Sequence, residues 1–309
     1  MTSKLALRQY IPLPPHPAGD FDHGDVYLES GHVFVANTAA GTVEVIDGER
    51  LRHVTTIPGC PEASGVLCAQ EDALIFAAAR GAGKLLVIDP TTNAVLRTVA
   101  FGQKPNGLAW DPRRKHLLVA DVQENQTRLI DPQAGEVIAS VELPGRPRWA
   151  VYHQARDRFL VNIREPACLA VLSANPFVLV ERFPVWSPGP HGLDLDQYGH
   201  RAFVACDGST VVTLDLATGR EQARVPIAGS PDAIWHNHQR GRLYVAIAHL
   251  GILNGVSGVI NVVNTQSMTV EEQIATEAGA HTTAHDARRQ RLYVFLPSCR
   301  VAVYEEREG

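Results

Sequence analysis

The sequence predicts an all-β protein, a seven-bladed β-propeller in which each blade has four antiparallel strands. One pattern recurs about every 42 residues along the 309-residue chain, seven times in all. Each copy holds four short strand-like segments separated by polar turns, and a repeat of this length and content is typical of a propeller blade. The copy that starts at Pro190 shows it best, with a Pro-His-Gly bend, a three-stranded meander and a fourth strand that ends at Ile227.

The copies share a constant register. An apolar strand starts 12 residues after each opening residue, which is Pro61, Pro105, Pro147, Pro190, Pro231 or Ala280. The residue that follows the Pro or Ala is therefore expected to begin the innermost strand of its blade. The first copy is less regular. We place His23 in its opening position, with Asp22 as the alternative, because Asp22-His23-Gly24 resembles Pro190-His191-Gly192.

The chain is predicted to form a single domain over residues 1–309, because each repeat must bury its sheet faces against its neighbours. The last repeat, residues 280–304, has only three strand-like segments, while residues 5–13 form an additional one that ends in prolines. We expect this N-terminal strand to complete blade seven, since an open edge would favour aggregation. The alternative is a frayed N-terminal tail.

The composition is that of an ordinary globular protein, with 45 % hydrophobic and 20 % charged residues. A formal net charge of −5 gives no support for a nucleic acid or an anionic membrane as partner. No apolar run approaches the roughly 18 residues of a spanning helix, and the N-terminus lacks the apolar core of a secretory signal. The five cysteines show no metal-type pairing, so we expect reduced thiols and a cytoplasmic protein.

Several short motifs resemble the YVTN-type family of seven-bladed β-propellers. They are LVIDPTTNAV at 86–95, PNGLAWDP at 105–112, LLVAD at 117–121 and TLDLATGRE at 213–221. The resemblance covers nearly the whole chain and implies the same fold, whereas the motifs shape turns and strand ends and carry no chemistry. The stretch PRWAVYH at 147–153 is also similar to the P-R-H-x-x-F-H stretch of the seven-bladed lactonases, with Trp149 in place of the expected His.

The residues in the opening position are the candidates for chemistry, because a propeller brings the start of every innermost strand to one end of its central channel. Six of the seven can carry charge or bind a metal ion. In blade order they are His23, Glu62, Asn106, Arg148, His191, Asp232 and His281.

Neighbouring blades are expected to supply a metal site. His191, Asp232, His281 and His23 offer imidazole and carboxylate ligands. Such ligands suit a divalent ion, which would be Zn, Fe, Mn, Ni or Cu.

The opposite arc of the ring is expected to bind the substrate. Arg148 and Asn106 lie there, and a guanidinium can hold a carboxylate or phosphate with two hydrogen bonds. Arg164 and His249, from turns at the same face, are further candidates. These residues predict a small anionic molecule as the ligand.

The catalytic candidates are Glu62, His281 and Asp232. Glu62 would act as general base beside the metal, and Asp232 would be a further ligand or would orient an imidazole. A bound metal ion polarises a carbonyl or activates water. The sequence therefore predicts a metal-dependent hydrolase or lyase that acts on a small anion in the channel.

Two other interpretations remain open. In one, the channel is hydrated and its charges pair with one another, His191 or His281 with Asp232 and Arg148 with Glu62. In the other, the chain is a non-catalytic scaffold that binds a protein through its rim, with residues 175–186 as contact candidate.

Blade six contains an insertion, residues 249–258, where other blades have a short turn. We expect this Gly-rich apolar segment to overhang the mouth of the channel. It would serve either as a lid or selectivity wall, or as a packing or dimer contact.

Overall fold

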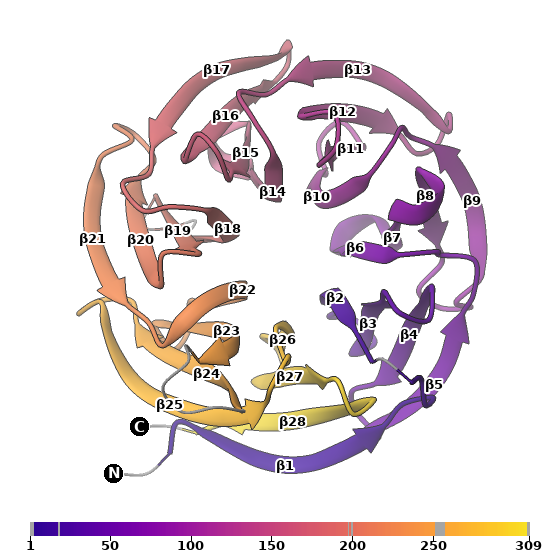
Figure 1. Cartoon of the computed structure of the whole chain (residues 1–309). Coiled ribbons are helices and arrows are strands. Elements are labelled where there is room, and N and C mark those ends of the chain that lie inside the picture. The colour runs from indigo at the N-terminus through magenta and orange to yellow at the C-terminus, as the bar shows by residue number, and fades with distance from the viewer. Residues whose placement is uncertain (1–2, 18, 197, 199, 251–256, 308–309) are drawn as a thin grey trace.

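The computed structural model consists of seven four-stranded antiparallel sheets arranged around a central axis (Figure 1). It describes residues 3–17, 19–196, 198, 200–250 and 257–307, with the backbone alone at positions 249, 250 and 257. The predicted seven-bladed β-propeller is therefore confirmed. In this part of the chain the helical elements are three short 3₁₀ turns, η1 (Gln70–Asp72), η2 (Arg80–Ala82) and η3 (Gln154–Arg156).

Each blade runs from an innermost strand at the axis to an outermost strand at the rim. The innermost strands are β2 (Phe21–Tyr27), β6 (Ala63–Ala69), β10 (Pro105–Asp111), β14 (Pro147–His153), β18 (Pro190–Asp196), β22 (Gly229–Asn237) and β26 (Thr282–Asp286). The second strands are β3 (His32–Asn37), β7 (Leu74–Ala79), β11 (His116–Asp121), β15 (Arg158–Ile163), β19 (Arg201–Cys206), β23 (Arg242–Leu250) and β27 (Arg291–Leu296). The third strands are β4 (Thr42–Asp47), β8 (Lys84–Ile88), β12 (Gln126–Asp131), β16 (Cys168–Ala174), β20 (Thr210–Asp215), β24 (Ser257–Asn264) and β28 (Arg300–Glu306). The outermost strands are β5 (Arg52–Ile57), β9 (Val95–Ala100), β13 (Glu136–Glu142), β17 (Phe177–Pro184), β21 (Glu221–Pro226), β25 (Thr269–Glu277) and β1 (Leu5–Pro12).

Blade seven is built from both ends of the chain, as predicted. β1 pairs antiparallel with β28, from Leu5 opposite Glu306 to Pro12 opposite Arg300. Figure 1 shows the two strands side by side, with the N and C ends close together. The side chain of Ile11 is fully buried. The N-terminal strand therefore closes the ring and removes the free edge of β28.

The hydrophobic core lies between adjacent blades. Phe34 of blade one and Ile75 of blade two belong to one buried cluster, and Ile11 and Phe295 of blade seven pack with Val33 of blade one in another. The alternation of each strand gives both sheet faces apolar side chains, so every blade depends on its two neighbours.

Close contact of the innermost strands around the axis requires glycine at one recurring position. A Cβ atom added to Gly65, Gly107 or Gly192 would lie 2.0–2.2 Å from a carbonyl oxygen of the next innermost strand. Any side chain there would push neighbouring blades apart. The three glycines thus fix the distance between blades at the channel.

All five cysteines are buried and free, which agrees with the reduced thiols expected from the sequence. Within the described residues, no helix has the length and apolar character needed to cross a membrane.

Candidate functional site

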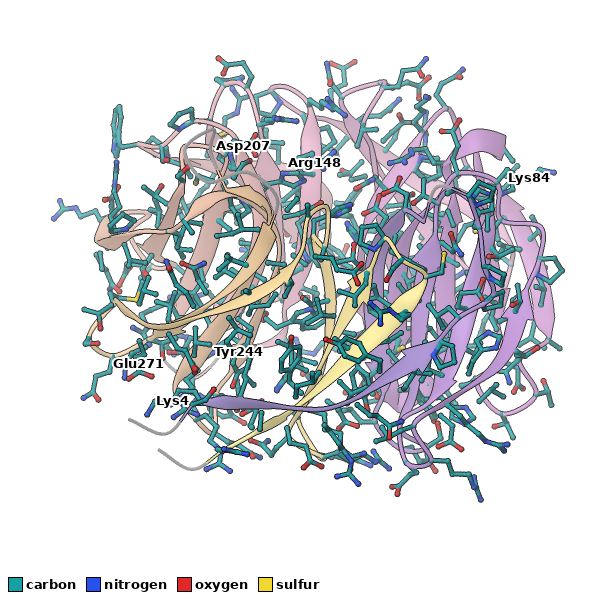
Figure 2. The ribbon with its side chains drawn as sticks, turned by 60° about the horizontal axis from the view of Figure 1, so that its bottom comes forward. Lys4, Lys84, Arg148, Asp207, Tyr244 and Glu271 are labelled. Atoms are coloured by element: carbon teal, nitrogen blue, oxygen red, sulfur yellow. The ribbon has the colours of Figure 1, made fainter. Side chains whose placement is uncertain are left out.

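One end of the central channel collects the side chains at the start of the innermost strands. Strand pairing identifies equivalent positions, since Ala63 pairs with Ala79 in blade two where Pro105 pairs with Asp121 in blade three. The residue after each of these positions is Asp22, Ser64, Asn106, Arg148, His191 or Asp232, and in blade seven His281 precedes β26. Figure 2 shows Arg148 at the same end of the propeller as Asp207.

Two of the predicted opening residues lie elsewhere. Blade one presents Asp22, the alternative considered, and His23 is one residue further along β2. Blade two presents Ser64, which is fully buried and donates to the carbonyl of Pro105. Glu62 lies before β6 with a side chain that is 53 % exposed, 3.6 Å from Arg80. The physical reason is that β6 starts two residues after Pro61, whereas β10 starts at Pro105 itself. The proline therefore does not mark the same position in every blade.

A chain of hydrogen-bonded side chains crosses three blades at this end of the channel. Oδ1 of Asp232 lies 3.1 Å from Nε2 of His191, and Oδ2 lies 2.9 Å from Nδ1 of His281. At its two ends, Nδ1 of His191 lies 3.3 Å from Oδ1 of Asp207, and Nε2 of His281 lies 3.4 Å from Oδ1 of Asp20. The structure thus brings together three of the predicted site residues, with the two histidines paired to one carboxylate.

The pKa values of these hydrogen-bonded side chains reflect their alternating charges. Burial alone would raise the pKa of Asp232, but the two imidazoles beside it hold that pKa well below its usual range. Burial would lower the pKa of His281, yet its hydrogen bonds to Asp20 and Asp232 raise it to about 10. The pKa of His191 is also raised, because the attraction of Asp232 and the bond to Asp207 outweigh burial. Positive charge therefore persists here at neutral pH.

Arg148 competes with Asp232 for the same nitrogen. Nη2 of Arg148 makes a hydrogen bond to Nε2 of His191. A guanidinium only donates, so this bond requires an unprotonated Nε2, whereas the bond from Nε2 to Asp232 requires a protonated one. The two bonds exclude each other. A ligand that draws Arg148 away would leave the proton on His191 and pair it with Asp232.

The arginines near the mouth differ in how far they are neutralised. Arg164 lies 2.6 Å from the carboxylate of Asp207. Arg148 contacts His191 and, among the described residues, makes no ion pair with a carboxylate. The pKa of Arg146 is lowered by burial and by repulsion from Arg148 and Arg164, which shows that these cations lie near one another. The site therefore carries excess positive charge on the arc where the sequence predicted an anion.

Asn106 is buried without a hydrogen bond. Its side chain is 1 % exposed, and within the described residues neither its amide nitrogen nor its amide oxygen has a partner. Leaving a buried polar group unpaired costs about 1–3 kcal/mol. An unpaired amide next to Arg148 in the ring is consistent with a group kept for a ligand.

His23 and Trp149 meet in the channel next to the residues at the starts of the innermost strands. Their rings stack with centroids 3.9 Å apart and an interplanar angle of 24°. The two residues come from β2 and β14, which lie on opposite sides of the central opening (Figure 1). Burial lowers the pKa of His23, so its ring is neutral in the stack. Trp149, the departure from the lactonase stretch, thus stacks on a side chain from the other side of the channel.

The predicted divalent ion has no matching set of ligands in this arrangement. Among the described residues, no group of three or more His, Cys, Asp or Glu side chains is placed to hold a metal ion. His191 and His281 are hydrogen-bonded to Asp232, and His23 is stacked on Trp149. Metal dependence stays a prediction.

Two further predictions concern the rim. Arg164 lies in the turn after β15 and forms an ion pair with Asp207, which also contacts His191. The side chain of His249 lies outside the described residues, and so does most of the insertion 249–258.

No family model matches the chain. A curated relative, the uncharacterized protein YncE of Salmonella typhi, is 22 % identical over 184 residues. The chain is distantly similar to YncE. This match covers 58 % of the chain and 49 % of the relative, so it spans about half the length of YncE. Together with the seven-bladed structure, it supports a β-propeller family, while the YVTN-type resemblance stays a prediction.

Sequence reasoning missed the two carboxylates that end the hydrogen-bonded chain. Asp207 follows β19 in an Asp-Gly-Ser turn, and such a turn is expected in any blade. The geometry of a propeller places turns between second and third strands on the same face as the opening residues. Asp207 could therefore have been found as a rim neighbour of His191. Asp20, in the segment before β2, had no comparable pattern.

Proposed function

We propose that the chain binds a small anionic molecule at the channel mouth and catalyses its hydrolysis or an elimination from it. The observation that carries the proposal is that four successive blades place Arg148, His191, Asp232 and His281 within contact distance of one another in sequence order. Arg148 would hold a carboxylate or phosphate group, and the unpaired amide of Asn106 would donate a further hydrogen bond.

His191 is the proposed general acid and base. Once an anion is bound to Arg148, Nε2 of His191 is protonated and pairs with Asp232. Asp207 accepts a hydrogen bond from the other ring nitrogen, Nδ1. The proton can then pass to a leaving oxygen, and Nε2 can take a proton from water or substrate in the next step. His281, with its pKa of about 10, contributes positive charge that stabilises a developing oxyanion. His191 thus takes the role that the sequence suggested for Glu62.

Calorimetric titration with malonate and with inorganic phosphate tests the binding step. We expect at least one of the two anions to bind the wild type, and Arg148→Gln to weaken that binding about tenfold or more. Arg182→Gln is the matched control, because Arg182 is exposed on the outer strand β17. Absence of binding to the wild type, or equal binding by Arg148→Gln, would refute the assignment.

Turnover is tested with a panel of small lactones and carboxylate esters in a pH-stat. His191→Gln should lower kcat by about 10²–10⁴-fold, the usual contribution of a general acid and base. Metal analysis of the purified protein tests the ion separately. A stoichiometric transition metal that is lost in the variant His191→Ala/His281→Ala would support the metal-dependent version, and a metal-free active protein would contradict it.

A binding scaffold is the second candidate, and the rim of blade four favours it. Val178 and Val180 on β17 are 42 % and 44 % exposed, and Trp186, which follows this strand, is 71 % exposed. Exposed apolar groups of this kind are typical of protein contacts. Partner capture that depends on Trp186 and is unaffected by Arg148→Gln would favour this function.

A further inference from the structure

We propose that the other half of the channel is a second ligand site and that it binds a small organic cation. A cavity of about 280 Å³ starts at the stacked pair His23 and Trp149. It continues past the ends of the innermost strands, where Gln70 and Pro112 line it. The proposed anion site lies at the starts of the same strands, so the two sites are on opposite sides of the stacked pair.

Two carboxylates line this cavity from equivalent positions on two blades. Asp25 lies on β2 and Asp194 on β18. Each carboxylate accepts one backbone N–H from its own strand and one from the innermost strand of the next blade. The four donors are the amides of Val26 and Cys68 for Asp25, and of Leu195 and His236 for Asp194. These bonds hold both carboxylates in place and leave each oxygen able to accept further bonds.

Neither carboxylate forms an ion pair with a cationic side chain in the part of the chain that the structure describes. Burial raises the pKa of Asp25 to about 7, and repulsion from Asp194 adds to the increase. Burial raises the pKa of Asp194 to about 6. Two buried carboxylates that lack a counter-charge bind a cation better than any anion or neutral molecule. The ligand would supply the missing positive charge.

The other groups near the two carboxylates do not supply that charge. Asp25 faces the Cys68 thiol, whose pKa burial raises well above its usual value. Asp194 accepts the backbone amide of His236, whose imidazole pKa is lowered by burial. It is attracted by His285, which is itself paired with Glu306 at 2.7 Å. His23 and Glu71 also line the cavity, and burial lowers the pKa of His23.

The aromatic side chains that line the cavity favour an organic cation over a metal ion. The cavity is lined by Trp110, Trp149, Trp235 and Tyr152, which include three of the four tryptophans of the chain. The indole nitrogens of Trp110 and Trp235 are hydrogen-bonded to Asp72 and to a backbone carbonyl, so both rings are fixed. Aromatic faces attract alkylammonium and quaternary ammonium groups through the negative charge of their π faces. A hydrated metal ion would gain little from such walls.

Tryptophan fluorescence and calorimetry with tetramethylammonium and tetraethylammonium chloride test the proposal on the full chain, against sodium chloride at equal ionic strength. We expect a saturable response to at least one of the two cations and none to sodium. The variant Asp25→Asn/Asp194→Asn should bind about tenfold more weakly or worse. The matched control is Glu136→Gln/Glu142→Gln, which removes the same charge from exposed positions on β13 and should bind like the wild type.

Two further measurements test whether the carboxylates bind the cation and whether this site is separate from the anion site. Binding to the wild type at pH 6.5 should release protons, seen as heats that depend on the ionisation enthalpy of the buffer, and affinity should rise from pH 5 to pH 8. This readout does not require the double variant to fold. Arg148→Gln should retain cation binding, which separates this site from the anion site. No saturable binding of either cation, or binding without proton release and without pH dependence, would overturn the proposal.

Discussion

Replacement of Asp232 by Asn tests the electrostatics of the channel mouth. The carboxylate lies between two histidines, with Oδ2 2.9 Å from Nδ1 of His281. The amide keeps the size of the side chain and removes its charge. Hydrogen bonds to Asp20 and Asp232, together with the charges of Asp232 and Asp22, overcome burial and raise the pKa of His281 from 6.5 to about 10. Asp232 provides two of these four contributions, so we expect its loss to lower the pKa of His281 by about one unit or more, which is about 1.4 kcal/mol or more.

The sign of the pH dependence follows from that pKa. A group whose pKa is higher in the folded than in the unfolded state stabilises the fold fully below its unfolded pKa. For His281 this stabilisation is complete below pH 6.5 and is lost as the pH rises toward about 10. Within this window the free energy of unfolding should fall by about 1.4 kcal/mol per pH unit for this one proton. In Asp232→Asn the decline should end at least about one pH unit earlier.

Two assays measure the effect. Urea unfolding at pH 6.5, 8 and 9.5 gives the slope of stability against pH, and NMR of ¹³C-labelled histidine gives the pKa of His281, assigned by the loss of its signal in His281→Gln. Asp207→Asn is the matched control, because Asp207 contacts His191 rather than His281. An unchanged pKa of His281 in Asp232→Asn, or a pH slope equal to that of the wild type, would refute the reasoning.

Two more substitutions probe the closure of the ring and the buried amide. Ile11→Ala in β1 should cost about 2–5 kcal/mol of unfolding free energy in urea, because Ile11 is fully buried; Leu7→Ala, at a residue 45 % exposed on the same strand, should cost far less, and equal costs would contradict the docking of β1. Asn106→Leu should leave thermal stability unchanged or raise it, since it removes an unpaired buried amide, while weakening the binding of malonate or phosphate. A destabilised Asn106→Leu that binds both anions normally would show that Asn106 has a structural role.

The architecture was predictable because its determinants repeat. A segment of four strands recurring about every 42 residues must bury both faces of each sheet against copies of itself, and this requirement leads to a ring of blades. The closure by β1 was also predictable, since the last repeat had one strand too few and an unused strand lay at the other end of the chain. Both inferences depend on the recurring pattern of apolar strands and polar turns.

The register of the innermost strands was harder to predict, because proline marks only the approximate start of each blade. The bulge in these strands shifts which side chain faces the axis, as between Pro105 and Leu108. Glycine is the better anchor, since Gly65 and Gly107 occupy the position where a Cβ atom would strike the next blade. Alignment on Gly65 gives Ser64 as the opening residue. Blade one offered no such guide, because a Cβ atom on Gly24 would meet the side chain of Phe295 instead.

The stacked pair of His23 and Trp149 gives the two ends of the channel opposite character. At the mouth, Arg148 and the protonated His281 attract anions, whereas Asp25 and Asp194 line the cavity on the other side without a counter-cation. Neutral rings can separate the two charged regions, because burial lowers the pKa of His23 and keeps its ring uncharged. In the proposed function, a ligand that enters from the mouth would be stopped at the stacked pair, and the side chains at the starts of the innermost strands would carry out any reaction on it.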